Sequence, residues 1–191
     1  MKKIEFSIDN IAALFLFRKD LIKYCSTKNE CFISSLNLNR ELKNYILDYF
    51  PKCKVNSYIS FFSIFQKVDL VISFGIRGII VSSFFRPFTK SVWILSGVGS
   101  VFRGKPFFKL KLIRALFSLI VFMRQKNINE IIVLNHSDRN LLHTRYKQLK
   151  NKIRIIKAEG FQSKNYKPNN LINISYVGRI TYDKGFDLFV D

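Results

Sequence analysis

The stretch from residue 68 to residue 88, VDLVISFGIRGIIVSSFFRPF, carries the pattern that decides the fold. Its first part, VDLVISFG, is a nearly continuous apolar run that ends at a glycine, which is typical of a strand covered on both faces. The following residues have the composition of a helix that ends before Pro87, because proline cannot continue a helix. A strand followed at once by a helix predicts one unit of a parallel sheet with crossover helices.

The same alternation continues in both directions along the chain. Further strands are expected at residues 2–8, 30–36, 52–59, 90–97, 130–135 and 152–160. Further helices are expected at residues 11–28, 39–50, 60–67 and 137–150 and around Leu112. Ser137 is expected to cap the N-terminus of the helix at 137–150, because its hydroxyl can accept a backbone hydrogen bond. The pattern predicts an α/β fold with a Rossmann-like parallel sheet.

The pattern changes after Gly160, where the polar stretch FQSKNYKPNNL is typical of a linker. Beyond it, INISYVGRITYDKGFDLFV begins a second strand-turn-helix unit. We therefore predict a first domain at 1–168 and the beginning of an incomplete second domain at 169–191.

The charge of the chain indicates an anionic partner. Lys and Arg number 32 against 13 Asp and Glu, so the net charge is +19. Nucleic acid, anionic lipid headgroups and a phosphorylated ligand are all partners that such a surface attracts. Part of the excess also reflects a composition rich in Lys, Ile, Asn and Phe.

The cysteines and histidines do not form a recognisable metal or disulfide pattern. Cys25, Cys31 and Cys53 form no CxxC pair, and the only histidines are His136 and His143. Neither a disulfide framework nor a zinc site is expected from such spacing, and the simple interpretation is a reducing compartment. We predict no metal and no cofactor.

The N-terminus and one internal segment indicate where in the cell the protein is expected. In MKKIEFSIDN the acidic side chains of Glu5 and Asp9 interrupt the apolar part, which argues against a secretory signal and favours the cytoplasm. The segment at 105–126, KPFFKLKLIRALFSLIVFMRQK, is shorter in its apolar part than a membrane-spanning helix. It fits either a mostly buried helix or a helix in the membrane interface, with its basic residues against anionic headgroups. Those basic residues are Lys105, Lys109, Lys111 and Arg114.

Three loops follow predicted strands and could meet a ligand, because ligands of parallel sheets bind at the carboxyl ends of the strands. They are SFGIRG at 73–78, LSGVGSVFRG at 95–104 and VGRITYDKG at 177–185. The second loop is rich in glycine and serine, but it has neither GK[ST] nor the full GxGxxG spacing. Its glycines fit either ligand contact or a sterically tight turn.

The third loop has the residues of a phosphate site. Arg179 can bond phosphate oxygens with two N–H groups, and Lys184 adds a second, mobile positive charge. Gly178 and Gly185 permit a turn that brings both side chains toward one point. Without further context, two solvated cations on a surface loop explain the same residues.

Four segments occur in the order that is found in one enzyme family. They are DLVISFGIRGIIVSSFF, WILSGVGSVF, IIVLNHSDRNLL and SYVGRITYDKGF. The chain resembles the N-terminal part of GT-B glycosyltransferases of the retaining, nucleotide-sugar-dependent class. It is most similar to the family 4-like bacterial members that build O-antigen or capsule.

The resemblance implies roles for particular residues. Gly178, Arg179 and Lys184 would bind the diphosphate of the sugar donor. Arg77, Ser96, Gly97, Gly99 and Ser100 would line the acceptor side of the cleft. It assigns no catalytic residue, and it implies a nucleotide sugar as substrate with no metal. Arg18 stands where the family often has the Arg of a His-Arg pair, although Phe17 precedes it.

The implied function is transfer of a sugar from a nucleotide-sugar donor to a lipid-linked glycan acceptor in surface polysaccharide or lipopolysaccharide biosynthesis. The protein would lie at the inner face of the cytoplasmic membrane. The chain spans only part of the family's usual length, so we expect a truncated polypeptide that transfers sugar poorly. The alternative is a basic protein that binds nucleic acid or a membrane surface without catalysis. Nucleic acid is the less expected partner, because most Phe residues stand in apolar runs.

Overall fold

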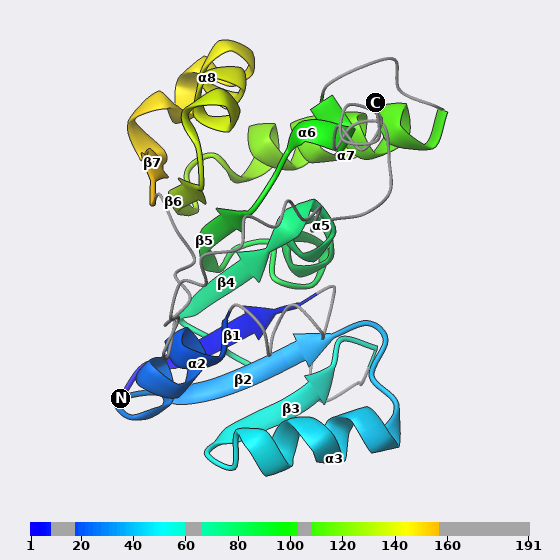
Figure 1. The fold of residues 1–191 in the computed structure, drawn as a ribbon, viewed down its shortest axis with the longest axis vertical. Helices are drawn as coiled ribbons and strands as arrows, with labels where there is room; N and C mark the ends of the chain where they lie inside the picture. Colours follow the sequence, from blue (N-terminus) through cyan, green and yellow to red (C-terminus); the bar gives the residue numbers. More distant parts are fainter. Residues whose placement is uncertain (9–17, 60–65, 103–107, 157–191) are drawn as a thin grey trace, which may run out of the picture. The chain divides into compact units, whose positions relative to one another are not determined.

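The computed structural model describes residues 1–8, 18–59, 66–102 and 108–156 (Figure 1). Within them, seven parallel strands form one sheet in the order β3-β2-β1-β4-β5-β6-β7. The strands are β1 Lys3–Ser7, β2 Glu30–Ser35, β3 Cys53–Ser57, β4 Leu70–Phe74, β5 Lys90–Leu95, β6 Ile128–Val133 and β7 Ile153–Ile155. The helices are α2 Lys19–Ser26, α3 Arg40–Tyr49, α5 Gly75–Phe85, α6 Gly99–Phe102, α7 Phe108–Arg124 and α8 His136–Arg145. A 3₁₀ helix, η2, spans Lys147–Lys152.

Helices cover both faces of the sheet, as the side chains of β5 show. Trp93 and Leu95 belong to a core formed with α5, α6, α7 and α8, whereas Val92 and Ile94 pack on a core formed with α2 and α3. This division follows from the period of two along a strand, which sends successive side chains to opposite faces. The helices that connect β1, β2 and β3 thus cover one face of the sheet, and the helices that connect β4, β5, β6 and β7 cover the other.

The winding direction reverses between the neighbouring strands β1 and β4. In an open parallel sheet this reversal leaves a crevice at the carboxyl ends of the strands, because the connections on either side lead away from it. The α/β fold with a Rossmann-like parallel sheet, predicted from the sequence, is confirmed.

Helix α5 lies unusually close to the end of β1. A side chain on Gly78 would place its Cβ 3.2 Å from the carbonyl oxygen of Ser7. The Ser7 hydroxyl in turn donates a hydrogen bond of 3.0 Å to the carbonyl oxygen of Gly78. The helix begins directly after β4 at Gly75, whose φ of 70° is a conformation that favours glycine. The two glycines therefore determine how α5 meets the sheet.

Gly78→Ala is expected to destabilise the fold by about 1–3 kcal/mol, because the added methyl group must push α5 away from a backbone carbonyl. Gly97→Ala is the matched control, since no atom lies within 4 Å of the Cβ position at Gly97. Urea denaturation followed by circular dichroism measures both. Equal losses for the two variants would show that the close approach of α5 to β1 is not what requires glycine.

The helix that follows β6 differs from the predicted one in its length and in its N-cap. The helix predicted at 137–150 is α8, which ends at Arg145 and is followed by η2. The predicted N-cap, Ser137, is wrong. Asn135 is the cap, and its side chain accepts a 2.7 Å hydrogen bond from the backbone N–H of Asp138. The N-cap lies two residues earlier than expected, because the strand β6 already ends at Val133.

The chain divides into two compact units, Met1–Glu159 and Gly160–Asp191. The second unit, the predicted boundary at 168, the predicted helix at 60–67 and the first part of the predicted helix at 11–28 lie outside the described residues. The domain division therefore stays a prediction. Among the described residues, no helix combines the length and the apolar composition needed to cross a bilayer.

Candidate functional site

A pocket of about 100 Å³ lies at the carboxyl ends of β1 and β2, beside the first turns of α5. It is lined by Ile8, Ser35, Leu36, Asn37, Arg77, Gly78 and Val81. The backbone N–H of Ile8 donates to the carbonyl oxygen of Ser34 at 3.0 Å, which ties the walls from β1 and β2 together. The pocket therefore occupies the edge of the sheet where a ligand of this fold is expected.

Of the described residues that line this pocket, Arg77 is the one with a charged side chain. It stands in the first turn of α5, and its side chain is exposed. The N-terminus of a helix carries partial positive charge, and no acidic residue occurs in this turn to offset it. Together with the side chains of Ser35 and Asn37, Arg77 can bond a phosphate, a carboxylate or the hydroxyl groups of a sugar.

A second arginine lies at the same edge, on the opposite face of the sheet. Arg18, the residue before α2, is buried, and its guanidinium carbon lies 4.4 Å from the centre of the Phe74 ring. Phe74 ends β4 and stacks on Phe6 of β1, with ring centres 6.4 Å apart. Phe6 and Phe74 belong to the core with α2 and α3, whereas Arg77 belongs to α5. The reversal between β1 and β4 is thus flanked by one arginine from each face.

The predicted glycine loop follows β5 at this same edge but does not line the pocket. Ser96 and Gly97 are exposed, and Val98 is buried beneath them. Gly99 and Ser100 begin the short helix α6, in which the Phe102 N–H bonds the Val98 carbonyl oxygen. Since β4 and β5 are neighbours, this loop lies beside the start of α5. The structure therefore places these residues at the expected edge without joining them to Arg77 in one cavity.

The residues predicted to bind the donor diphosphate, Gly178, Arg179 and Lys184, lie outside the described residues. Their role stays a prediction. Arg103 and Gly104 of the glycine-rich loop also lie outside the described residues.

The cysteines are poorly suited to chemistry in this structure. Cys31 and Cys53 face each other in the register of β2 and β3, and both are free and buried. Burial raises the pKa of Cys31 to about 12 and that of Cys53 to about 11, so both thiols stay protonated at neutral pH. A protonated thiol is a poor nucleophile. Structural packing in the core explains both residues.

The histidines lie on α8, away from the pocket. Burial, followed by the charges of Arg139 and Lys150, lowers the pKa of His143, so its ring is neutral at pH 7. Among the described residues, no three His, Cys, Asp or Glu side chains gather where they could hold a metal ion. The histidines take no part in the candidate site.

Some residues of the pocket have only a weak signal in the sequence. Ser35 and Asn37 stand at the end of β2, far from Arg77 along the chain. Their only sequence signal is their position after a predicted strand, and that signal does not say which strand ends are adjacent. Gly78 has a clearer signal, because a glycine inside an apolar helix indicates that another backbone approaches closely.

Comparison with known proteins finds similar folds among solved structures but no similar sequence. No family model matches the chain, and no curated protein matches it in sequence. The solved structure of Anabaena Alr3699/HepE in complex with UDP and glucose matches 84% of this chain with a TM-score of 0.57 and 13% identity. A UDP-N-acetylglucosamine 2-epimerase matches 80% of the chain with a TM-score of 0.48 and 12% identity. The chain spans 45% of the length of each. The likeness to HepE shows that the two chains share a Rossmann-like α/β fold over this part.

Proposed function

We propose that this chain forms the acceptor-side part of a nucleotide-sugar-dependent glycosyltransferase. The observation that carries the proposal is the pocket beside Arg77, at the point where the winding of the parallel sheet reverses. The shared fold with HepE, a protein whose structure holds UDP and glucose, supports this use of the fold. The acceptor is proposed to be a lipid-linked glycan of surface polysaccharide biosynthesis, and the stereochemical class the retaining one.

The proposed roles follow from charge. Arg179 and Lys184 hold the diphosphate of the donor and stabilise the negative charge that develops on it as the glycosidic bond breaks. Arg77, with Ser35 and Asn37, orients hydroxyl or phosphate groups of the acceptor. Electrostatic stabilisation of a leaving diphosphate needs cations that are held in position, and the predicted loop at 177–185 supplies two of them.

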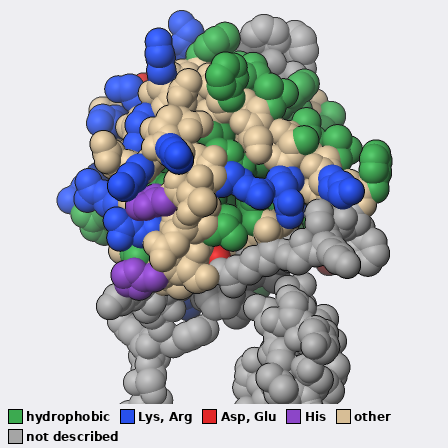
Figure 2. Space-filling view, turned by 90° about the horizontal axis from the view of Figure 1, so that it is seen from above, with side chains coloured by type: hydrophobic (Ala, Val, Ile, Leu, Met, Phe, Trp, Pro, Cys, Tyr) green, Lys and Arg blue, Asp and Glu red, His purple; other side chains and the backbone are tan. Residues whose placement is uncertain are grey.

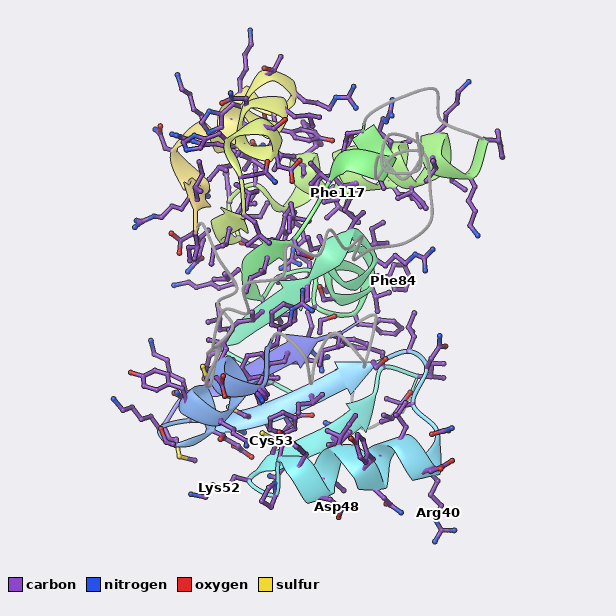
Figure 3. All side chains as sticks on the ribbon, viewed as in Figure 1. Arg40, Asp48, Lys52, Cys53, Phe84 and Phe117 are labelled. Atoms are coloured by element: carbon purple, nitrogen blue, oxygen red, sulfur yellow. The ribbon has the colours of Figure 1, made fainter. Side chains whose placement is uncertain are left out.

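Binding of UDP and UDP-glucose to the full chain, measured by isothermal titration calorimetry, tests the donor site. The double variant Arg179→Ala, Lys184→Ala is expected to weaken binding about tenfold or more, because a charge-assisted hydrogen bond to phosphate is worth about 1.5–3 kcal/mol. The control is Arg40→Ala, Lys52→Ala, which removes the same charge near α3 (Figure 3). An equal loss in the control would show that only the overall positive charge attracts the nucleotide, and the donor site would be refuted.

The pocket is tested separately with Arg77→Ala. This variant is expected to keep its affinity for UDP and to lose affinity for a polyprenyl-diphosphate-linked sugar in detergent micelles. Arg77 is exposed, so the substitution leaves the core unchanged, and circular dichroism verifies the fold. Unchanged binding of the lipid-linked sugar would remove Arg77 from the acceptor site.

A further inference from the structure

Helix α7 has an apolar face that the described part of the chain leaves uncovered. Its exposed apolar residues are Phe108, Leu112, Ala115, Leu116, Leu119, Phe122 and Met123, here called the α7 stripe. At about 100° per residue these positions share one arc of the helix of about 120°. The opposite arc carries Phe117, Val121 and Arg124, which are buried. The helix therefore has two apolar faces, of which the core uses one.

Lysines stand on both sides of the stripe. Lys109 follows one edge of the arc and Lys111 the other, and both are exposed. The sequence Phe108–Arg124 contains no Asp or Glu. Figure 2 shows hydrophobic side chains gathered on the side of the molecule away from the two histidines of α8, with Lys and Arg side chains next to them.

A basic groove of about 510 Å³ runs along one edge of the stripe, between α7 and the end of α8. It is lined by Lys111, Arg114, Ala115, Ser118, Arg145 and Tyr146. Ala115 belongs to both the groove and the stripe, so the two surfaces are continuous. Of the described residues, three cations and no carboxylate line this groove.

Two of the three cations of the groove, Arg114 and Arg145, are held in position. Arg114 donates from Nε and Nη2 to the carbonyl oxygen of Val101, at 3.1 and 2.7 Å. The guanidinium carbon of Arg145 lies 5.2 Å from the centre of the Phe102 ring, and that of Arg114 lies 5.8 Å from it. Arg114 therefore has a structural role as well as a charge, while Lys111 stays exposed. Such a groove suits an anionic group that approaches from outside.

We propose that the α7 stripe and the adjoining groove form a docking surface for an anionic lipid bilayer. The stripe enters the boundary between headgroups and acyl chains, and the groove receives a lipid phosphate. The helix lies in the plane of the membrane, because its other face is packed in the core and it cannot leave the domain. An apolar face bordered by lysines is the arrangement that binds such an interface.

A second copy of the chain is a poorer occupant of the same face. Pairing two stripes would bring the lysines of both copies together, with no acidic residue on α7 to oppose them, and each copy carries a net charge of +19. An anionic membrane instead offers both the apolar phase and the negative charge. Nucleic acid would satisfy the cations and leave the aliphatic part of the stripe in water.

Vesicle flotation without any nucleotide tests the proposal apart from glycosyl transfer. Vesicles contain either phosphatidylcholine alone or an equal mixture of phosphatidylcholine and phosphatidylglycerol. The chain is expected to bind the mixture and to lose binding as salt is raised. Lys109→Gln, Lys111→Gln is expected to weaken binding about 25-fold, since one basic residue at an anionic surface contributes about a fivefold change. The matched control, Arg40→Gln, Lys52→Gln, removes the same charge at the far edge of the sheet and is expected to bind almost as the parent does.

The apolar contribution is tested with Leu119→Ser, Phe122→Ser, which is expected to weaken binding at least tenfold at every salt concentration. Its control is Ile59→Ser, an exposed residue that follows β3. Equal losses in variants and controls would refute the docking surface. So would tighter binding of single-stranded RNA than of vesicles, lost with Lys109 and Lys111. A dimer in sedimentation equilibrium that Leu119→Ser, Phe122→Ser converts to a monomer would identify a second copy as the occupant and overturn the proposal.

Discussion

Glu5→Gln is expected to lower the free energy of unfolding by about 3–5 kcal/mol, because it removes the carboxylate charge of Glu5 that faces the buried charge of Arg86. Nε of Arg86 donates to a carboxylate oxygen of Glu5 at 2.7 Å, and the two side chains are 5% and 1% exposed. Glu5 lies on β1, and Arg86 is the C-cap residue directly after α5. The pair therefore joins the strand and the helix on which the candidate pocket is built. Urea denaturation at neutral pH, followed by circular dichroism, measures the loss.

Two further variants identify the cause of this loss. Glu30→Gln removes a carboxylate from the exposed pair with Lys54 and is expected to leave stability nearly unchanged, because water screens that pair. The double variant Glu5→Leu, Arg86→Met removes both buried charges and is expected to cost much less than the sum of its single variants. A loss in Glu30→Gln as large as in Glu5→Gln would contradict the explanation by burial.

Phe117→Ala is expected to destabilise the fold by about 3–5 kcal/mol, through lost burial and the cavity that remains. Phe117 is 1% exposed and lies at the centre of an aromatic cluster. Its ring centre is 5.6 Å from that of Trp93, 5.7 Å from that of Phe102 and 5.9 Å from that of Tyr146. Figure 3 labels Phe117 on α7, whose inner face packs on the sheet through this cluster. Thermal and urea denaturation report the loss.

Phe122→Ala is the control on the same helix. Phe122 is 68% exposed, so its removal is expected to change the free energy of unfolding by no more than about 0.5 kcal/mol. The comparison also bears on the α7 stripe. If Phe122→Ala costs as much as Phe117→Ala, the outer face of α7 is covered within the chain itself and is not available to a membrane.

The sequence was informative where the signal was local. The apolar run at 68–75 and the helical stretch after it predicted β4 and α5 nearly to the residue, because a continuous apolar run that ends at a glycine and a helix that must end before Pro87 are visible in neighbouring positions. Arg77 was assigned to the site through the family resemblance, in a loop that closely follows this strand. The N-cap of α8 was assigned to the wrong residue, because Asn135 and Ser137 have similar capping chemistry and the end of β6 decides between them.

The α7 segment shows the limit of such signals. From sequence it fitted either a mostly buried helix or an interfacial one, and its composition could not separate them. In the structure the core covers the face of Phe117 and Val121, and the face of Leu119 and Phe122 remains exposed. Which apolar face is buried depends on the sheet and on α5, and these lie elsewhere in the chain.

The amino-acid sequence by itself determined the α/β class, most of the strands and helices, and the loops that end the strands, because these depend on residues close together in the chain. Only the tertiary structure decided which strand ends lie side by side, and hence that Ser35 and Asn37 join Arg77 in one pocket. It also decided that Glu5 and Arg86 pair in the core. Strand order is set by pairing between distant segments, and the hydrophobic pattern of a single strand carries no record of its neighbour.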